Sequence, residues 1–257
     1  MKEKVICGID FSVNSPGVVW VKTDEQFNVI DRKWITFTNK KKYVSDDPRA
    51  TIEYIGTVKD KRTFNNNIDQ NIGVRDSIWE WIINATDKLS IMPSGFELTC
   101  LSLFDYCVFE DYALAAKGRV FHIAEATMTM KLKIFENNIP IRLYPPNHIK
   151  LFATGHGNAD KFEMENAFEA LSEEERRGMD LTCIPTLKEQ KNGNPRDNII
   201  DAFWASELLR TELKLRFGLI ALYDLPEHQI KVFNLTTKSY PTNILAREFL
   251  QKGKMYE

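Results

Sequence analysis

The chain has 257 residues, a formal net charge of −2 and 27% charged residues. This length suits one large domain or two small ones. The balanced charge excludes a highly basic nucleic-acid coat and a charged disordered tail, so any contact with a polyanion must come from a local patch of the surface.

The four cysteines show no CxxC or CxxH spacing, which is typical of reduced, buried thiols in a cytoplasmic protein. The apolar run before Asp10 is too short for a signal peptide, and no run approaches the length needed to span a membrane. We therefore expect a cytoplasmic location.

The first predicted strand covers residues 5–9, a short β-branched apolar run that Asp10 closes. Turn residues at 14–17 then send the chain back through a second apolar run at 18–21. Strand-like pieces between residues 27 and 37 complete a predicted antiparallel meander of three strands. A buried carboxylate needs a partner, although an aspartate here could also be only a turn or capping residue.

A second buried strand is predicted at residues 106–109, and Glu110 and Asp111 follow it directly. Two buried strands that each end in an acid suggest parallel neighbours whose carboxyl ends share one edge of a sheet, where open α/β sheets place their sites. Between the two strands, the polar residues 38–72 indicate a surface insertion with one strand at 51–58, and apolar spacing predicts a helix over 74–89.

Asp197 and Asp201 lie four residues apart at the start of a late predicted helix, so they share one helix face, with Asn198 beside them. The other predicted elements are a helix from Gly118 to about 137, a strand at 140–144, a segment at 145–152, a helix at 159–171, the late helix at 196–217 and a helix at 243–251.

Several carboxylates gathered in apolar surroundings repel one another unless cations neutralise them. Hard oxygen ligands suit Mg²⁺ or Mn²⁺, and two such ions about 4 Å apart can promote phosphodiester cleavage. The alternative interpretation is purely structural: Asp197 caps its helix and Glu110 pairs with a lysine.

Three short motifs in a fixed order carry a resemblance to a known family: Gly8-Ile9-Asp10, Phe109-Glu110, and Asp201-Ala202 followed by Ala205. In this order they resemble the RNase H-like superfamily and, within it, the RuvC-type Holliday-junction resolvases, over residues 4–38 and 74–216. The chain is longer than the bacterial cellular resolvases and closer to the phage-encoded branch, which would place it in the host cytoplasm.

The resemblance implies an α/β fold with an RNase H-like mixed sheet, in which the antiparallel three-stranded meander joins parallel strands and helices flank the sheet. The nuclease domain would span residues 1–217, with insertions at about 38–72 and 172–195. Residues 218–257 would form a C-terminal extension whose role the sequence leaves open.

The resemblance also implies a metal-dependent endonuclease that resolves four-way junctions by paired nicks, as a homodimer, leaving a 5′-phosphate and a 3′-hydroxyl. Asp10 would bridge two Mg²⁺ (or Mn²⁺) ions, Glu110 would hold one of them, and Asp201 matches the last acid of the family helix. The companion acid of the family falls at Asn198, with Asp197 one position earlier, so either could complete the site.

Basic residues near the scissile phosphate are implied at Lys150 and Lys161, of which Lys161 would be catalytic. The block of sequence from 115 to 161 carries seven basic and three acidic residues, which supports a nucleic-acid partner. The proposed DNA-binding residues are Lys117, Arg119, Lys150, Lys161 and Tyr112, the last by stacking on an opened base. Solvated lysines and a half-buried tyrosine remain the alternatives.

Three other functions stay open from the sequence. The fold could act on other branched DNA or on RNA–DNA hybrids, or it could be a non-catalytic DNA-binding module. An actin-like or sugar-kinase ATPase also begins with a strand, an aspartate and a glycine turn, but the residues 154–157 are a poor match to its second phosphate-binding motif.

Overall fold

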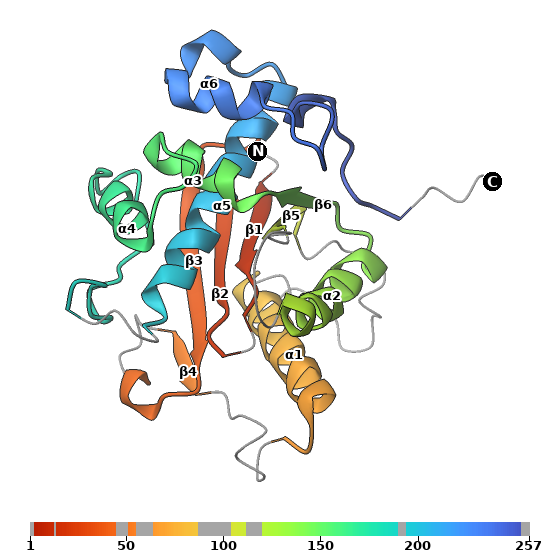
Figure 1. The fold of residues 1–257 in the computed structure, drawn as a ribbon, viewed down its shortest axis with the longest axis vertical. Coiled ribbons are helices and arrows are strands. Elements are labelled where there is room, and N and C mark those ends of the chain that lie inside the picture. Colours follow the sequence, from red (N-terminus) through yellow and green to blue (C-terminus); the bar gives the residue numbers. More distant parts are fainter. Residues whose placement is uncertain are drawn as a thin grey trace.

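The computed structural model describes residues 3–12, 14–44, 51–54, 64–86, 104–111, 120–189 and 194–252. Its centre is a six-stranded mixed sheet in the order β4-β3-β2-β1-β5-β6 (Figure 1). The strands are β1 (Lys4–Asp10), β2 (Gly17–Thr23), β3 (Val29–Thr38), β4 (Ile52–Tyr54), β5 (Tyr106–Glu110) and β6 (Ile141–Tyr144).

The first three strands form the predicted antiparallel meander, and Asp10 of β1 lies opposite Gly17 of β2. The two strand-like pieces expected between residues 27 and 37 are one continuous strand, β3. The predicted meander is therefore confirmed.

The remaining strand pairs are parallel: β1 with β5, β5 with β6, and β3 with β4. Because β1 and β3 both run antiparallel to β2, all strands except β2 point the same way and end at one edge, here called the carboxyl edge. Asp10 and Glu110 are the last residues of β1 and β5 and therefore both lie at this edge.

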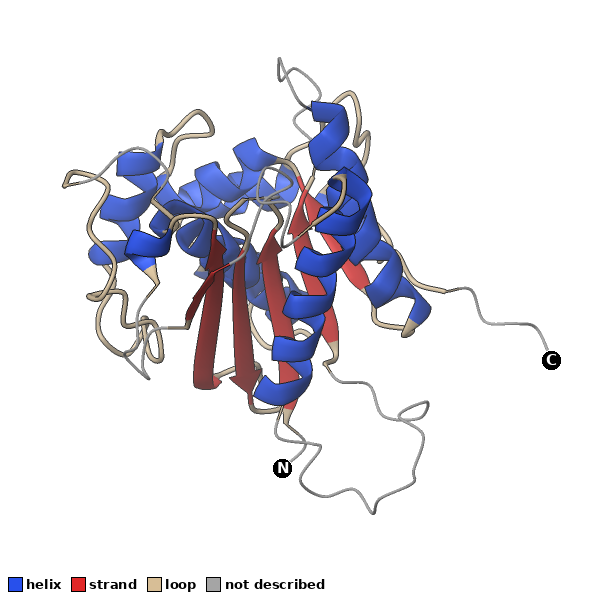
Figure 2. Ribbon diagram, turned by 90° about the horizontal axis from the view of Figure 1, so that it is seen from below, coloured by secondary structure: helices blue, strands red, loops and turns tan. Residues whose placement is uncertain are grey.

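Helices lie on both faces of the sheet (Figure 2). One apolar cluster joins the sheet to the two helices that carry Ile78 and Met130, and a second joins it to the helix of Phe203 and the helices around it. The helices are α1 (Asn67–Ala85), α2 (Val120–Glu136), α3 (Pro146–Thr154), α4 (Lys161–Glu169), α5 (Arg196–Arg216) and α6 (Glu227–Asn234), with 3₁₀ turns η1 (Lys41–Tyr43), η4 (Leu222–Asp224) and η5 (Ile244–Ala246).

Helix α5 packs directly on β1 because the strand carries a glycine at the contact. A Cβ atom on Gly8 would lie 2.4 Å from the carbonyl oxygen of Ala202, so no side chain fits there. This close approach holds the N-terminal turns of α5 against the carboxyl edge.

The predicted α/β class is confirmed: an antiparallel three-stranded meander joins parallel strands in one mixed sheet, and helices flank it. Among the described helices, none has the length and apolar character that crossing a bilayer requires.

Two expectations need correction. Helix α1 begins at Asn67, inside the predicted insertion, because the side chain of Asn66 caps it by accepting a hydrogen bond from the Asp69 backbone N–H. The helix predicted over 243–251 is wrong: this stretch contains only η5 and an isolated bridge between Leu250 and Ile141. The bridge supplies backbone partners to the edge strand β6, which a helix at that position could not do.

Candidate active site

Four carboxylates converge at the carboxyl edge. Asp10 and Glu110 come from the ends of β1 and β5, and Asp197 and Asp201 from the first two turns of α5. They lie close enough that the charges of Glu110, Asp201 and Asp197 all act on Asp10. The structure thus brings together the four acids that the sequence singled out.

Burial and mutual repulsion raise the pKa values of three of these acids. Burial first, and then the charges of Glu110 and Asp201, raise the pKa of Asp10 well above its usual value. Burial and the charge of Asp201 raise the pKa of Glu110 to about 8, and burial with the charge of Asp197 raises the pKa of Asp201 to about 7. Without cations, the cluster holds protons near neutral pH.

Two lysines from neighbouring helices face the acids. Lys161, at the start of α4, donates a hydrogen bond to Oδ2 of Asp197. Burial lowers the pKa of Lys161, but this hydrogen bond and the charges of the acids outweigh that effect, so its pKa is raised overall. The charge of Lys150, from α3, lowers the pKa values of Glu110 and Asp201.

The N-cap of α4 determines where the helix begins and thereby the position of Lys161, its first residue. Asp160 is the N-cap, and its Oδ1 accepts hydrogen bonds from the backbone N–H groups of Phe162 and Glu163, both at 2.9 Å. The carboxylate of Glu163 in turn accepts from the Asp160 N–H at 2.7 Å, which completes a capping box. The side chain of Lys161 therefore projects from a well-defined helix start toward α5.

The side chain of Asn198 binds the loop after β1 through hydrogen bonds. Its Nδ2 donates to the backbone oxygen of Ser15 and, at 2.9 Å, to the Ser15 hydroxyl. The backbone of Asn198 also packs on Gly17, where a Cβ would lie 2.4 Å from the Asn198 carbonyl oxygen. Between the two residues that the sequence left open, Asp197 lies among the acids, whereas the Asn198 amide is engaged by Ser15.

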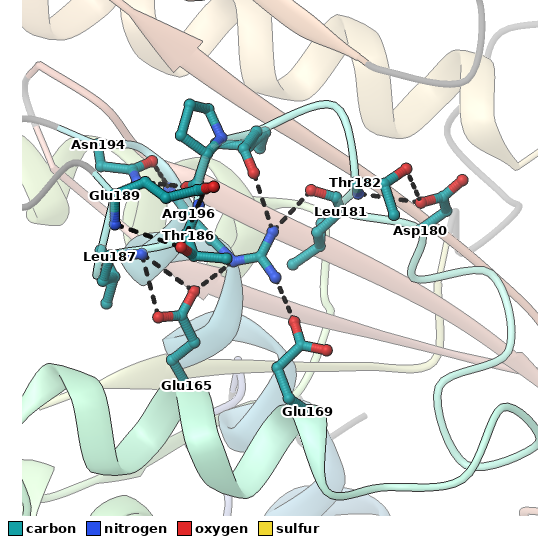
Figure 3. Close-up of polar contacts among 12 residues, drawn as sticks. Glu165, Glu169, Asp180, Leu181, Thr182, Thr186, Leu187, Glu189, Asn194 and Arg196 are labelled. Atoms are coloured by element: carbon teal, nitrogen blue, oxygen red, sulfur yellow. Dashed lines mark hydrogen bonds and ion pairs between the residues drawn. The ribbon is translucent and has the colours of Figure 1, made fainter.

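Sequence reasoning missed Arg196, which comes immediately before Asp197 and is 4% exposed. Its Nε donates to Glu165 at 2.6 Å, its Nη1 to the carbonyls of Leu181 and Ile184 at 2.6 and 3.1 Å, and its Nη2 to Glu169 (Figure 3). A cation in the first turn of a helix opposes the helix dipole, so a buried arginine there signals acidic partners elsewhere.

Three proposed DNA-binding residues, Tyr112, Lys117 and Arg119, lie outside the described residues. Lys150 and Lys161 are described and face the acids.

The donors suit a hard divalent cation, because all four are carboxylates and their mutual repulsion is what bound cations relieve. Among the described residues, however, no three histidine, cysteine or acidic side chains are already close enough to share an ion. Since Asp197 is hydrogen-bonded to Lys161, this pair would have to separate before Asp197 could become a ligand.

Comparison of the sequence with protein-family models and with curated proteins gives no match. Comparison of the fold with solved structures finds RuvC of Thermus thermophilus at a TM-score of 0.44 and 14% identity, covering 83% of this chain and 96% of that one. The T. thermophilus RuvC in complex with a Holliday junction substrate gives 0.45 and 13%, covering 84% and 96%.

Proposed function

We propose that this protein is a metal-dependent endonuclease that acts on branched DNA and resolves four-way junctions by paired nicks. The observation that carries the proposal is the cluster of four carboxylates at the carboxyl edge, faced by two lysines. Acids that repel one another so strongly at a partly exposed edge cost stability, and such arrangements are typical of functional sites.

The four acids, Asp10, Glu110, Asp197 and Asp201, would hold Mg²⁺ or Mn²⁺, with two ions per site. When bound, such ions lower the pKa of an attacking water and neutralise charge on the leaving oxygen. Lys161 and Lys150 would then contact the non-bridging oxygens of the phosphate and orient it. A water molecule would add to phosphorus and lose a proton, the bond from phosphorus to O3′ would break, and O3′ would take up a proton, leaving a 5′-phosphate and a 3′-hydroxyl.

Paired nicks on a symmetric junction call for two active sites, and we propose that α2 joins two copies of the chain. Its inner face is buried against the sheet through Ala126, Met130 and Ile134. Its outer face carries exposed apolar side chains: Phe121 at 83%, Met128 at 49% and Leu132 at 46%. A helix face with this much exposed apolar surface is typical of an interface.

The nuclease proposal is tested with a labelled immobile four-way junction, a linear duplex of the same sequence and an RNA–DNA hybrid, each incubated with protein and Mg²⁺. We expect symmetric nicks confined to the junction, and no nicks from the Asp10→Asn and Glu110→Gln variants. Glu227→Gln is the matched control, because it makes the same kind of change on α6, where the exposed Glu227 forms an ion pair with Lys231.

Cleavage of the RNA–DNA hybrid alone would indicate that the substrate is RNA–DNA, and the assignment of the metal site would stand. Binding of the junction without cleavage, whichever divalent metal is added, would indicate that the protein is a DNA-binding module and not a nuclease. Nicking by Asp10→Asn at the parental rate would overturn the assignment of the site.

The dimer proposal is tested by analytical ultracentrifugation of the Phe121→Ser/Met128→Ser double variant. We expect the parent to sediment as a dimer and the variant as a monomer. Tyr223→Ser is the control, since Tyr223 is 84% exposed in η4, outside α2. A monomeric parent, or a variant that remains dimeric, would contradict the role of α2.

A further inference from the structure

The 3₁₀ turn η1 follows β3 at the carboxyl edge, the same edge that carries the acids. Thr36 of β3 lies opposite Gly17, which lies opposite Asp10, so the ends of β1 and β3 are level across the sheet. The chain leaves β3 at this edge and enters η1, which carries Lys41 and Lys42. These two lysines, with Lys40, are here called the lysine turn.

A direct contact ties the lysine turn to the loop after β1. Nδ2 of Asn39 donates to Oδ1 of Asn14 at 3.2 Å. Asn14 is four residues beyond Asp10, and a chain of that length spans at most about 14 Å. Because β2 lies between β1 and β3 and Lys41 is five residues beyond Thr36, the lysine turn lies within about 28 Å of Asp10, which is at most about eight nucleotides of a DNA strand.

The charges of Lys41 and Lys42 face solvent. Both residues are exposed, and neither forms an ion pair with a carboxylate in the part of the chain that the structure describes. Their ammonium groups lie over aromatic rings instead: Lys41 Nζ is 5.6 Å from the ring centroid of Tyr54, and Lys42 Nζ is 4.8 Å from that of Tyr43. Contacts of this kind orient a cation without cancelling its charge.

Tyr54 ends the short strand β4 and is 39% exposed. The lysine turn therefore presents positive charge beside an exposed aromatic ring, a combination that suits a nucleic-acid strand through phosphate contacts and stacking. The described residues 39–44 and 51–54 contain three basic residues, Lys40, Lys41 and Lys42, and one acid, Glu53, so positive charge predominates at the lysine turn.

We infer that the lysine turn binds phosphates of one DNA arm within about eight nucleotides of the phosphate that enters the active site. This inference rests on the proposed function, because the substrate is taken to be DNA. It extends that function by assigning a second contact surface, which follows β3 and is separate from Lys150 and Lys161 beside the acids. A strand crossing the edge would meet Lys161 at the acids and then the lysine turn.

The test compares Lys41→Ala/Lys42→Ala with Lys238→Ala/Lys252→Ala, a control pair of exposed lysines in the C-terminal segment. All variants carry Asp10→Asn, so that DNA is not cut in the presence of Mg²⁺. The dissociation constant for the labelled junction is measured by fluorescence anisotropy over a series of salt concentrations. Nicking is measured separately in the background with Asp10 intact.

We expect the lysine-turn variant to bind several-fold more weakly than the control pair. The slope of log K against log salt should fall by about 0.9 for each lost contact, or about 2 in all. A patch of hydroxyl-radical protection within about eight nucleotides of the nick should disappear in this variant alone. Equal affinity, slope and footprint in the two variants would overturn the inference.

The two proposals fail in different ways. If the parent nicks junctions and the lysine-turn variant matches the control, only the inference is wrong. If the parent binds the junction without nicking it, and the lysine-turn variant still lowers the slope of log K against log salt, the inference holds and the proposed catalysis fails. If the parent does not bind DNA, both are overturned.

Discussion

The ammonium group of Lys161 donates a hydrogen bond to Oδ2 of Asp197, joining the start of α4 to the start of α5. The lysine side chain is 61% exposed and the aspartate side chain 10% exposed, so the pair lies where the acid cluster opens to solvent. A lysine so placed can neutralise either the acid or an incoming phosphate.

If Lys161 contacts the phosphate, Lys161→Ala should lower the single-turnover rate of junction nicking by roughly 100-fold, the usual effect of removing one preorganised donor. Lys231→Ala is the control, because Lys231 is exposed and forms an ion pair with an exposed acid on α6. Thermal unfolding should change little in Lys231→Ala, whose ion pair is exposed. Lys161→Ala should lower the melting temperature, because the nearly buried Asp197 loses its cation, so the nicking rates are compared at a temperature at which both variants are folded. An unchanged nicking rate in Lys161→Ala would make the lysine a structural partner of Asp197 alone.

We expect Asp197 to be a functional residue and Asn198 to be a structural one. Asp197→Asn should abolish Mg²⁺-dependent nicking and keep the folded structure. Asn198→Ala should lower the free energy of unfolding by about 1–2 kcal/mol, because the acceptors on Ser15 lose their donor. Denaturant unfolding and nicking rates measured on both variants test this. Loss of nicking in Asn198→Ala at unchanged stability would reverse the assignment.

The metal-free protein should lose stability as pH rises from about 4.5 toward 8. Folding raises the pKa of Glu110 to about 8 and that of Asp201 to about 7. Above about pH 4.5 the folded state therefore holds protons that the unfolded chain has already released. The stability that these protons provide declines as pH rises, until the pH exceeds the pKa values of Glu110 and Asp201 in the folded state. Mg²⁺ should restore stability at about pH 8 and have little effect at about pH 5, where the ligands are protonated.

Thermal unfolding in EDTA and in Mg²⁺ across this pH range measures the effect, and Glu110→Gln isolates it from other titrating groups. The variant should show a smaller decline in melting temperature with pH than the parent. A parent and variant with identical pH profiles would contradict the assignment of the shift to the acid cluster.

Removal of Arg196 should destabilise the fold strongly. Arg196→Gln leaves Glu165 buried without its cation, an effect of about 3–5 kcal/mol on the free energy of unfolding. Arg177→Gln, an exposed arginine in the neighbouring segment, should cost less than about 1 kcal/mol. The double variant Arg196→Leu/Glu165→Leu should recover part of the loss, and failure to recover any would indicate that the carbonyls of Leu181 and Ile184 dominate.

The C-terminal segment should stabilise the sheet through the backbone of Leu250. Its N–H donates to the Ile141 carbonyl at 2.9 Å, and its carbonyl accepts from the Ile141 N–H at 2.8 Å, so it covers the edge strand β6. Leu250→Pro removes the donor and should lower the free energy of unfolding by about 1–3 kcal/mol. Leu250→Ala keeps the donor and should have a much smaller effect in denaturant titrations.

Much of the fold could be predicted from the sequence, because local patterns determine it. Apolar runs that end in acids predicted β1 and β5 and their shared edge, and three- and four-residue spacing predicted most of α1. The four acids that the structure brings together could also be identified from the sequence. Burying a carboxylate costs free energy, so an acid at the end of a buried strand indicates a partner or a function.

Contacts between residues far apart in the chain were decided only by the tertiary structure. Asn198 and Ser15 are 183 residues apart, and no local period signals that an amide near the acids will be used by a distant loop. Leu250 and Ile141 pair through backbone groups, which leave no trace in side-chain pattern. The sequence placed the lysine turn in a surface insertion, and only the strand directions located it at the carboxyl edge. The physical reason is common to all three: packing sets these contacts, and sequence periodicity reports only on neighbours within the same helix or strand.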